Sequence, residues 1–253
     1  MKTMVRLFTF FGNSNTGKTA VIVELAKKLQ EKGYKVSYLK NTDRDHFDLD
    51  PKDKDTGRLN ESRVVLGRAN LEFFMRMRTK ERLKIEDILS IPMVRSCDFL
   101  LIEGNHDFPT PKILFLRECG EFSRLDDMTV GVFSRNEMVR SMAEKKGLIV
   151  FDEERMDDMI EFVERSSIPP LPNMNCKLCG YSCGEMAKLM ALGRKRMEDC
   201  KILSSRKVDV RINGRRMNLV PFLEDILRDV ILGVLRNLKG YEGRGDVEVR
   251  IRR

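Results

Sequence analysis

An octapeptide near the amino terminus, GNSNTGKT at residues 12–19, constrains the fold of this 253-residue chain more than any other feature. It fits the pattern G-x-x-x-x-G-K-[ST], and it stands between an apolar run at residues 4–11 and a helix-periodic stretch at residues 18–32. A strand, a glycine-containing loop and a helix in this order form a phosphate-binding loop, because backbone N–H groups and the helix amino terminus point at phosphate oxygens. The chain is therefore expected to bind a purine nucleotide.

The residues of this loop have separate expected roles. Gly12 and Gly17 let the backbone turn tightly, Lys18 should reach the β- and γ-phosphates, and the Thr19 hydroxyl should ligate Mg²⁺. An ordinary turn followed by a helix-capping threonine is the alternative interpretation. The predicted nucleotide contacts are Gly12, Asn13, Ser14, Asn15, Thr16, Gly17, Lys18, Thr19 and Ala20.

Two acidic segments are candidates to complete a magnesium site. Glu103 ends the apolar run CDFLLIE, where a carboxylate can face a metal bound at the phosphate loop, although an acid exposed to solvent is also common there. The loop HFDLDPKDKDT offers further acids that could meet the metal or orient an attacking water, or could simply be solvated. The catalytic candidates are Lys18, Asp48 and Glu103.

Apolar runs alternate with helical patterns over the first two thirds of the chain, which predicts an α/β fold: a mostly parallel sheet with helices on both faces, as in P-loop NTPases. We expect about seven strands, at residues 4–11, 35–40, 71–77, 97–102, 112–117, 128–133 and 148–151. Helices are expected at residues 18–32, 84–91, 136–146 and 155–166.

A proline-rich stretch, SSIPPLPNMN at residues 166–175, predicts a boundary because it cannot continue a helix or a central strand. The expected organisation is a nucleotide-binding domain at residues 1–166, a linker at 167–175, a four-cysteine motif at 176–203 and a small α+β appendage at 204–253 that packs with the motif. The appendage should contain a hairpin that turns at Asn213-Gly214 and a helix at 221–239 with one wide apolar face.

Four of the six cysteines, Cys176, Cys179, Cys183 and Cys200, fall within 25 residues. Three thiols in one tight loop and a fourth after a short helix favour a [4Fe-4S] cluster, whereas zinc ribbons usually have two separate C-x2-C pairs. Zinc remains the alternative metal. Cys97 and Cys119 stand alone and are expected to be packed thiols.

Three segments together, namely the phosphate loop, HFDLDPKDKDTGR and LLIEGNHDFPTPKI, resemble the molybdopterin-guanine dinucleotide biosynthesis adapter family (MobB) over residues 1–165. The resemblance implies a GTP-binding protein that assists the guanylyltransferase attaching GMP to molybdopterin. The guanine preference rests on this resemblance alone, since no N-K-x-D motif is evident. The sequence departs from the family pattern at Asp45, Gly57 and Ala20. The nucleotide-site or partner-site residues implied in this way are Asp48, Asp50, Asp55, Arg58, Glu103, Gly104 and Lys112.

The cysteine segment resembles the small [4Fe-4S] domain of anaerobic redox proteins, and archaeal adapter-like proteins with this module resemble the chain as a whole. The expected function is thus a GTP-binding accessory protein of molybdenum or tungsten cofactor biosynthesis. Hydrolysis should be weak or stimulated by a partner, either the guanylyltransferase or a molybdoenzyme. A nucleotide-dependent metallochaperone or an iron-sulfur redox protein unrelated to pterin is the alternative, and the cysteine module could also be only a structural staple or a dimerisation device.

Composition limits the other partners. The net charge of +8 permits binding to nucleic acid, but the chain has no tryptophan and no aromatic stripe on which bases could stack, so nucleic acid is not expected. The sequence contains no run of about 18 apolar residues, so a membrane span is not expected. We expect a cytoplasmic homodimer.

Overall fold

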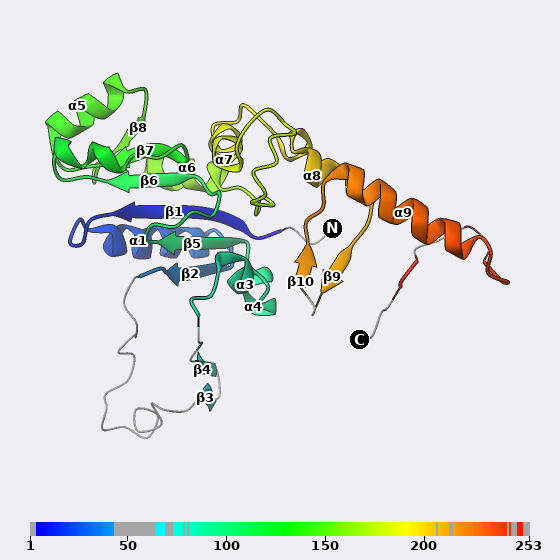
Figure 1. Cartoon of the computed structure of the whole chain (residues 1–253). Helices are drawn as coiled ribbons and strands as arrows, with labels where there is room; N and C mark the ends of the chain where they lie inside the picture. Colours follow the sequence, from blue (N-terminus) through cyan, green and yellow to red (C-terminus); the bar gives the residue numbers. More distant parts are fainter. Residues whose placement is uncertain are drawn as a thin grey trace.

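The computed structural model describes residues 4–42, 64–68, 73–77, 79, 81–205, 207–212, 215–241, 243 and 247–249. Its body is a six-stranded sheet in the order β2-β5-β1-β6-β7-β8, in which every neighbouring pair is parallel (Figure 1). This confirms the predicted α/β class. The strands are β1 (Arg6–Gly12), β2 (Val36–Lys40), β5 (Phe99–Glu103), β6 (Lys112–Phe115), β7 (Thr129–Phe133) and β8 (Ile149–Phe151).

Helices cover both faces of the sheet, which is why its central strands are apolar on both sides. On one face Phe8 and Phe10 of β1 join a core with α1 (Lys18–Glu31) and α6 (Met156–Ser166). On the other face Leu7 packs near α3 (Ile85–Leu89) and α4 (Pro92–Arg95), while Phe11 packs near α5 (Glu137–Lys145) and the short 3-10 helix η1 (Cys119–Arg124). No helix in the described part of the chain is long and apolar enough to cross a membrane.

Two local predictions differ from the structure. The strand expected at residues 71–77 is present as β4 (Phe73–Met77), but it pairs antiparallel with β3 (Val64–Arg68) as a separate two-stranded sheet. The single helix expected at residues 84–91 is followed at once by a second one, α4, which begins at Pro92. Proline disfavours helical backbone at the residue before it, here Ile91, and so ends α3 and starts α4.

The proline-rich stretch is extended, but its first half packs on the main core. Ile168 and Leu7 exchange backbone hydrogen bonds, with the Leu7 N–H donating to the Ile168 carbonyl at 2.7 Å. β6 pairs with β1 only from Thr9 onward, so Ile168 occupies the side of β1 that β6 leaves open. Ile168 and Leu171 are both buried. The segment expected to act as a linker is thus part of the packing around the central strand.

The carboxy-terminal part follows this stretch. α7 (Cys183–Ala191) contributes Met186 and Ala187 to the core shared by α1 and α6. After α8 (Lys201–Ser204) come β9 (Val210–Ile212) and β10 (Arg215–Met217), which confirm the predicted hairpin, although its turn lies outside the described residues. The last helix, α9 (Pro221–Leu235), projects from the body (Figure 1).

Candidate functional site

The phosphate loop lies where the strand order reverses. From β1 the chain passes through α1 to β2 on one side, and the later strands β6, β7 and β8 extend the sheet on the other. In open parallel sheets, ligands bind at the carboxyl ends of the strands beside such a switch point. The loop that begins at Gly12, the carboxyl end of β1, occupies this position.

Backbone geometry explains the glycine at the start of the loop. Gly12 has φ +141°, and a Cβ atom there would lie only 2.4 Å from the carbonyl oxygen of Phe115 on β6. The loop then closes on itself, with the Thr16 hydroxyl donating to the Asn13 carbonyl at 3.0 Å. Gly17 caps α1 without a side-chain hydrogen bond to the first helical amides, so these amides remain available to an anion at the helix amino terminus.

Lys18 folds back over the loop and is only 8% exposed. Its Nζ donates to the Asn13 carbonyl at 2.5 Å and to the Thr16 hydroxyl at 3.1 Å. Burial lowers the pKa of Lys18, and nearby cations act in the same direction while Glu103 opposes them. A phosphate group at this position would add negative charge and so stabilise the ammonium of Lys18 further.

Thr19 and Glu103 are adjacent, as the magnesium prediction requires. The Thr19 hydroxyl donates to both carboxylate oxygens of Glu103, at 3.0 and 2.9 Å. The Tyr38 hydroxyl also donates to Glu103, at 2.6 Å, and burial together with this hydrogen bond raises the pKa of Tyr38 above its usual range. A hydroxyl and a carboxylate are hard oxygen ligands, so Thr19 and Glu103 could hold Mg²⁺, which would neutralise charge on bound phosphates.

Gly104 brings the end of β2 next to this pair. Its φ is +111°, and a Cβ atom would lie 2.0 Å from the carbonyl oxygen of Asn41. The Asn41 N–H donates to the Glu103 carbonyl at 2.7 Å, so the chain leaving β2 is fixed beside the strand that carries Glu103. This close packing explains why residue 104, which the family resemblance also implies, is a glycine.

Four cations that the sequence reasoning missed surround the loop. Lys40, Arg117 and Arg124 are close enough to lower the pKa of Lys18. The guanidinium of Arg135 lies 3.6 Å from the position of a Cβ atom on Gly17, and it pairs with Glu153. Lys40 and Arg117 end apolar runs, and Arg135 comes two residues after one. A cation at such a position was the available signal, because in a parallel sheet it reaches the edge that carries the phosphate loop. Arg124, in η1, had no such signal.

Glu121 was also missed, because it lies in the short helix η1 without a recognisable pattern. It is buried and accepts hydrogen bonds from the Asn13 side chain and from the Arg117 N–H, the latter at 2.6 Å. Burial acts to raise the pKa of Glu121, but these hydrogen bonds outweigh it and lower that pKa. The carboxylate therefore stays ionised and anchors the first turn of the phosphate loop.

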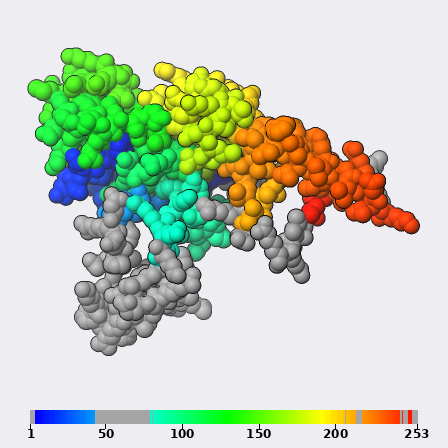
Figure 2. All heavy atoms as spheres, viewed as in Figure 1, coloured from blue at the N-terminus to red at the C-terminus, as the bar shows by residue number. Residues whose placement is uncertain are grey.

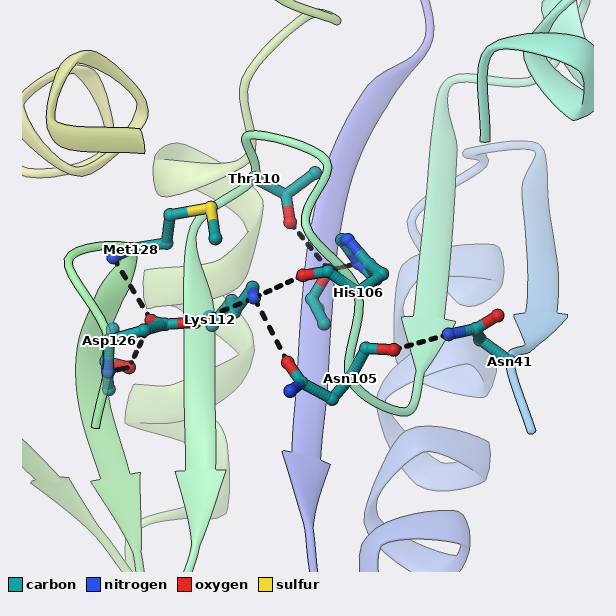
Figure 3. A network of polar contacts seen from close by, with 9 residues as sticks. Asn41, Asn105, His106, Thr110, Lys112, Asp126 and Met128 are labelled. Carbon is teal, nitrogen blue, oxygen red and sulfur yellow. Dashed lines mark hydrogen bonds and ion pairs between the residues drawn. The ribbon is translucent and has the colours of Figure 1, made fainter. Parts of the chain in front are cut away.

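Lys112, implied by the family resemblance, is buried in a polar network beside the site (Figure 3). Its Nζ donates to Asp126 at 2.8 Å, to the His106 carbonyl at 2.6 Å and to the Asn105 side chain at 3.3 Å. The Asn105 carbonyl in turn accepts from the Asn41 side chain at 2.5 Å. Lys112 thus fixes the loop that directly follows Glu103, and it does not face the phosphate loop.

His106 belongs to the same network as a neutral imidazole. Its Nε2 is 2.9 Å from the Thr9 hydroxyl, which also bonds Thr110 at 2.8 Å. Burial, aided by the charge of Lys112, lowers the pKa of His106 to about 4. The groups around this imidazole are the hydroxyls of Thr9 and Thr110 and the ion pair of Lys112 with Asp126.

The acidic loop cannot be compared with the prediction. Its candidates His46, Asp48, Asp50, Asp53, Asp55 and Arg58 lie outside the described residues. The catalytic role of Asp48 therefore stays a prediction.

All four clustered cysteines line one small pocket, together with Tyr181 and Met186. Cys183 is the first residue of α7 and directly follows the capping residue Ser182. The N–H of Cys183 donates to the side chain of Asn175 at 2.8 Å. Burial raises the pKa of Cys200, and the neighbouring Cys179 and Cys183 add to this shift. Among the described residues, no three His, Cys, Asp or Glu side chains converge as a ready-made metal site. As a donor set, four thiols around one largely apolar pocket suit a thiolate-ligated metal or cluster.

The other two cysteines are separate from this pocket. Cys97 accepts a hydrogen bond from the Ser37 hydroxyl at 2.9 Å, and Cys119 packs against the core beneath η1. Neither lies near the four-thiol pocket, and both are partly buried.

Comparison with known proteins finds a match to the nucleotide-binding part of the chain and a match to the cysteine segment. The family model described as "Molybdopterin guanine dinucleotide synthesis protein B" (MobB) matches residues 7–133, and one described as "Putative Fe-S cluster" matches residues 171–202. A Methanocaldococcus jannaschii protein named "Putative molybdopterin-guanine dinucleotide biosynthesis adapter protein" is 26% identical over 256 residues, covering 98% of this chain and 97% of its own. The crystal structure of Bacillus subtilis MobB shares the fold, with a TM-score of 0.52 and 22% identity over 63% of this chain and 96% of that one. Since the first family model spans half of the sequence, the chain belongs to the MobB family.

Proposed function

We propose that the protein is a GTP-binding adapter of molybdopterin-guanine dinucleotide biosynthesis, serving molybdenum or tungsten cofactors in the cytoplasm and carrying a [4Fe-4S] cluster on its four clustered cysteines. The observation that carries the nucleotide part is the contact between Thr19 and Glu103 beside the phosphate loop. The pathway follows from membership of the MobB family and from the name of the M. jannaschii relative.

The charges around the loop support a triphosphate ligand. Lys18 is buried, and three cations, Lys40, Arg117 and Arg124, act on it against the single carboxylate of Glu103, so the negative charge of a bound phosphate group would help to balance the site. Mg²⁺ held by Thr19 and Glu103 would accompany such a ligand. The preference for guanine rests on the family.

Glu103 suits a metal ligand better than a general base. Its carboxylate oxygens already accept hydrogen bonds from the hydroxyls of Thr19 and Tyr38, and the ammonium of Lys40 lies 3.8 Å away, so these oxygens are engaged at the position where Thr19 would hold the metal. Activation of water is therefore left to Asp48 or to a partner protein. Weak or partner-stimulated hydrolysis is consistent with an adapter.

The cluster proposal rests on the four thiols that line one pocket and on the match to the iron-sulfur family. Bound iron would supply electron transfer or a structural staple, and Cys176, Cys179, Cys183 and Cys200 would be its ligands.

One contact favours a second candidate, in which nucleotide binding is coupled to cluster or electron transfer. The hydroxyl of Ser182, the residue that caps α7, donates to the Asp127 carboxylate at 3.2 Å. The adjacent residue, Asp126, binds Lys112 of the nucleotide-binding sheet. The cysteine segment and the loop after Glu103 are thereby connected through consecutive residues.

The test uses the full chain purified without oxygen. Calorimetry should show GTP binding that depends on Mg²⁺ and is lost in Lys18→Ala, whereas Lys27→Ala, an exposed lysine of α1, should bind like wild type. Equal GTP affinity in Lys18→Ala and wild type would refute the nucleotide site.

Added protein should then accelerate GMP attachment to molybdopterin by a purified guanylyltransferase. If it does not, while iron is present and GTP alters the rate at which the cluster is reduced, the second candidate function replaces the first.

A further inference from the structure

The chain that leaves β6 carries two arginines beside the phosphate loop. β6 pairs with β1, so this chain emerges at Phe115 next to the loop that begins at Gly12. In Figure 2 this end of the molecule, where blue and green segments meet, lies opposite α9. Arg117 comes two residues after β6, and Arg124 is the last residue of η1. We call residues 117–124 the arginine segment.

The 3-10 geometry of η1 fixes the direction of Arg124. Side chains three residues apart in such a helix point the same way. One pair of this kind, Cys119 and Phe122, packs into the core beneath η1. The other pair is Glu121 and Arg124, and the carboxylate of Glu121 accepts a hydrogen bond from the side chain of Asn13 in the phosphate loop. Arg124 therefore projects from the side of η1 that faces the loop.

The carboxylate of Glu121 joins the arginine segment to the phosphate loop. One of its oxygens accepts from Asn13, and the other accepts from the N–H groups of Arg117 at 2.6 Å and Glu118 at 3.4 Å. The carbonyl of Asn13 in turn accepts from the ammonium of Lys18 at 2.5 Å. The arginine segment and this ammonium are thus held at the same part of the phosphate loop through one residue.

Both guanidinium groups are available to a ligand. The Arg117 side chain is 59% exposed, and its one carboxylate contact, to Glu121, is long at 3.9 Å. Arg124 is exposed and makes no ion pair with any residue that the structure describes. Each arginine is close enough to Lys18 to lower its pKa. Three cations that repel one another in the empty loop would all be stabilised by an anion bound between them.

The terminal phosphate of a nucleoside triphosphate fits these cations. Lys18 is expected to reach the β- and γ-phosphates, and the arginines act on that same ammonium. A terminal phosphate carries more negative charge than the phosphates within the chain and has three free oxygens. The planar fork of N–H donors on a guanidinium can bind two such oxygens at once.

We propose that Arg117 and Arg124 bind the terminal phosphate of GTP, and that Glu121 is the positioning residue that holds them against the phosphate loop. This inference rests on the nucleotide site proposed above and specifies how that site distinguishes GTP from GDP. GDP lacks the phosphate that both guanidinium groups contact, so the arginines should contribute to the binding of GTP and hardly to that of GDP.

Calorimetry of the full chain with Mg²⁺ and either GDP or a non-hydrolysable GTP analogue tests the arginines. Arg117→Ala and Arg124→Ala should each weaken binding of the analogue about 10-fold or more, because a hydrogen bond between two charged groups is lost. Binding of GDP should change less than about 3-fold. Arg95→Ala is the matched control, since Arg95 is exposed on α4, before β5 begins at the other end of the strands. All three arginines are exposed, so circular dichroism should be unchanged.

Glu121→Gln tests the positioning role. An amide has one acceptor oxygen, and its N–H₂ group would face other donors, so the hydrogen bonds from Asn13 and from the Arg117 N–H cannot both remain. The variant should lower the ratio of analogue affinity to GDP affinity, as the arginine variants do. In a chain that already lacks both arginines, Glu121→Gln should leave this ratio unchanged. An equal loss of both ligands in Glu121→Gln would make Glu121 a purely structural residue and overturn its positioning role.

The outcomes separate this inference from the proposed function. Wild type that binds both nucleotides, together with arginine variants that lose neither or lose both equally, overturns the assignment of Arg117 and Arg124 to the terminal phosphate and leaves the nucleotide site intact. Wild type that binds neither nucleotide overturns the proposed nucleotide site, and the role of the arginines with it.

Discussion

The buried ammonium of Lys112 makes the sharpest stability prediction. Lys112 is 1% exposed, and its Nζ donates three hydrogen bonds, including one to the carboxylate of Asp126 at 2.8 Å. Lys112→Met keeps most of the length of the side chain and removes all three hydrogen bonds. Breaking a buried ion pair by removing one partner costs about 3–5 kcal/mol. The Asp126 side chain is 28% exposed, so water can partly solvate the carboxylate that remains, and we expect the lower end, about 3 kcal/mol.

Thermal unfolding monitored by calorimetry measures this effect. For a protein of this size, each kcal/mol shifts Tm by about 2–4 °C, so Lys112→Met should unfold roughly 6–12 °C below wild type. Lys145→Met, an exposed lysine at the end of α5, is the matched control and should shift Tm by less than about 1 °C. Asp126→Asn should cost less than Lys112→Met, because the amide oxygen still accepts from Lys112. A Tm for Lys112→Met within about 2 °C of wild type would refute the role of the network.

Three further predictions concern the metal, pH and the cysteines. Glu103→Gln should weaken the Mg²⁺ dependence of GTP binding more than GTP affinity itself, and an unchanged Mg²⁺ titration would leave Glu103 a structural residue. The pKa of His106 is 6.5 in the unfolded chain and about 4 in the folded one. As the pH falls, the unfolded state therefore binds the proton first, and the free energy of unfolding, which is full above pH 6.5, decreases as the pH falls toward 4. His106→Gln should remove about 3 kcal/mol of that acid sensitivity in urea titrations, and identical pH profiles would contradict the buried neutral imidazole. Cys179→Ser should abolish the visible charge-transfer absorption and most of the bound iron, Cys97→Ser should preserve both, and a colourless wild type with stoichiometric zinc would exclude the cluster.

The sequence predicted those features that depend on residues close together along the chain. The phosphate loop and the strand that ends at Glu103 are local patterns of apolar runs, glycines and a terminal charge, and the parallel order of the sheet then brings Thr19 and Glu103 into contact. The same reasoning failed for residues 71–77, because an apolar alternating run does not specify which strand it pairs with.

Other features depend on contacts between residues distant in sequence. Nothing in the sequence around Lys112 indicates that this lysine will be fully buried, because its partner Asp126 lies 14 residues later, in the segment that connects β6 to β7. The apolar periodicity of residues 221–239 correctly indicated a helix with one hydrophobic face, but periodicity cannot tell whether that face meets the same chain or another molecule.

The hydrogen bonds between Leu7 and Ile168 bear on how far the nucleotide-binding unit extends. β1 lies in the middle of the sheet, yet its first residues lack a strand neighbour on the β6 side, and the backbone of Ile168 satisfies them instead. A chain that stops at residue 165 would expose unpaired N–H and C=O groups at the centre of the molecule, an edge on which another chain can add a strand. It should therefore aggregate on concentration, whereas a chain that extends through Pro172 should remain monodisperse in light scattering. A proline-rich stretch that resembles a tether in the sequence thus protects the central strand from self-association.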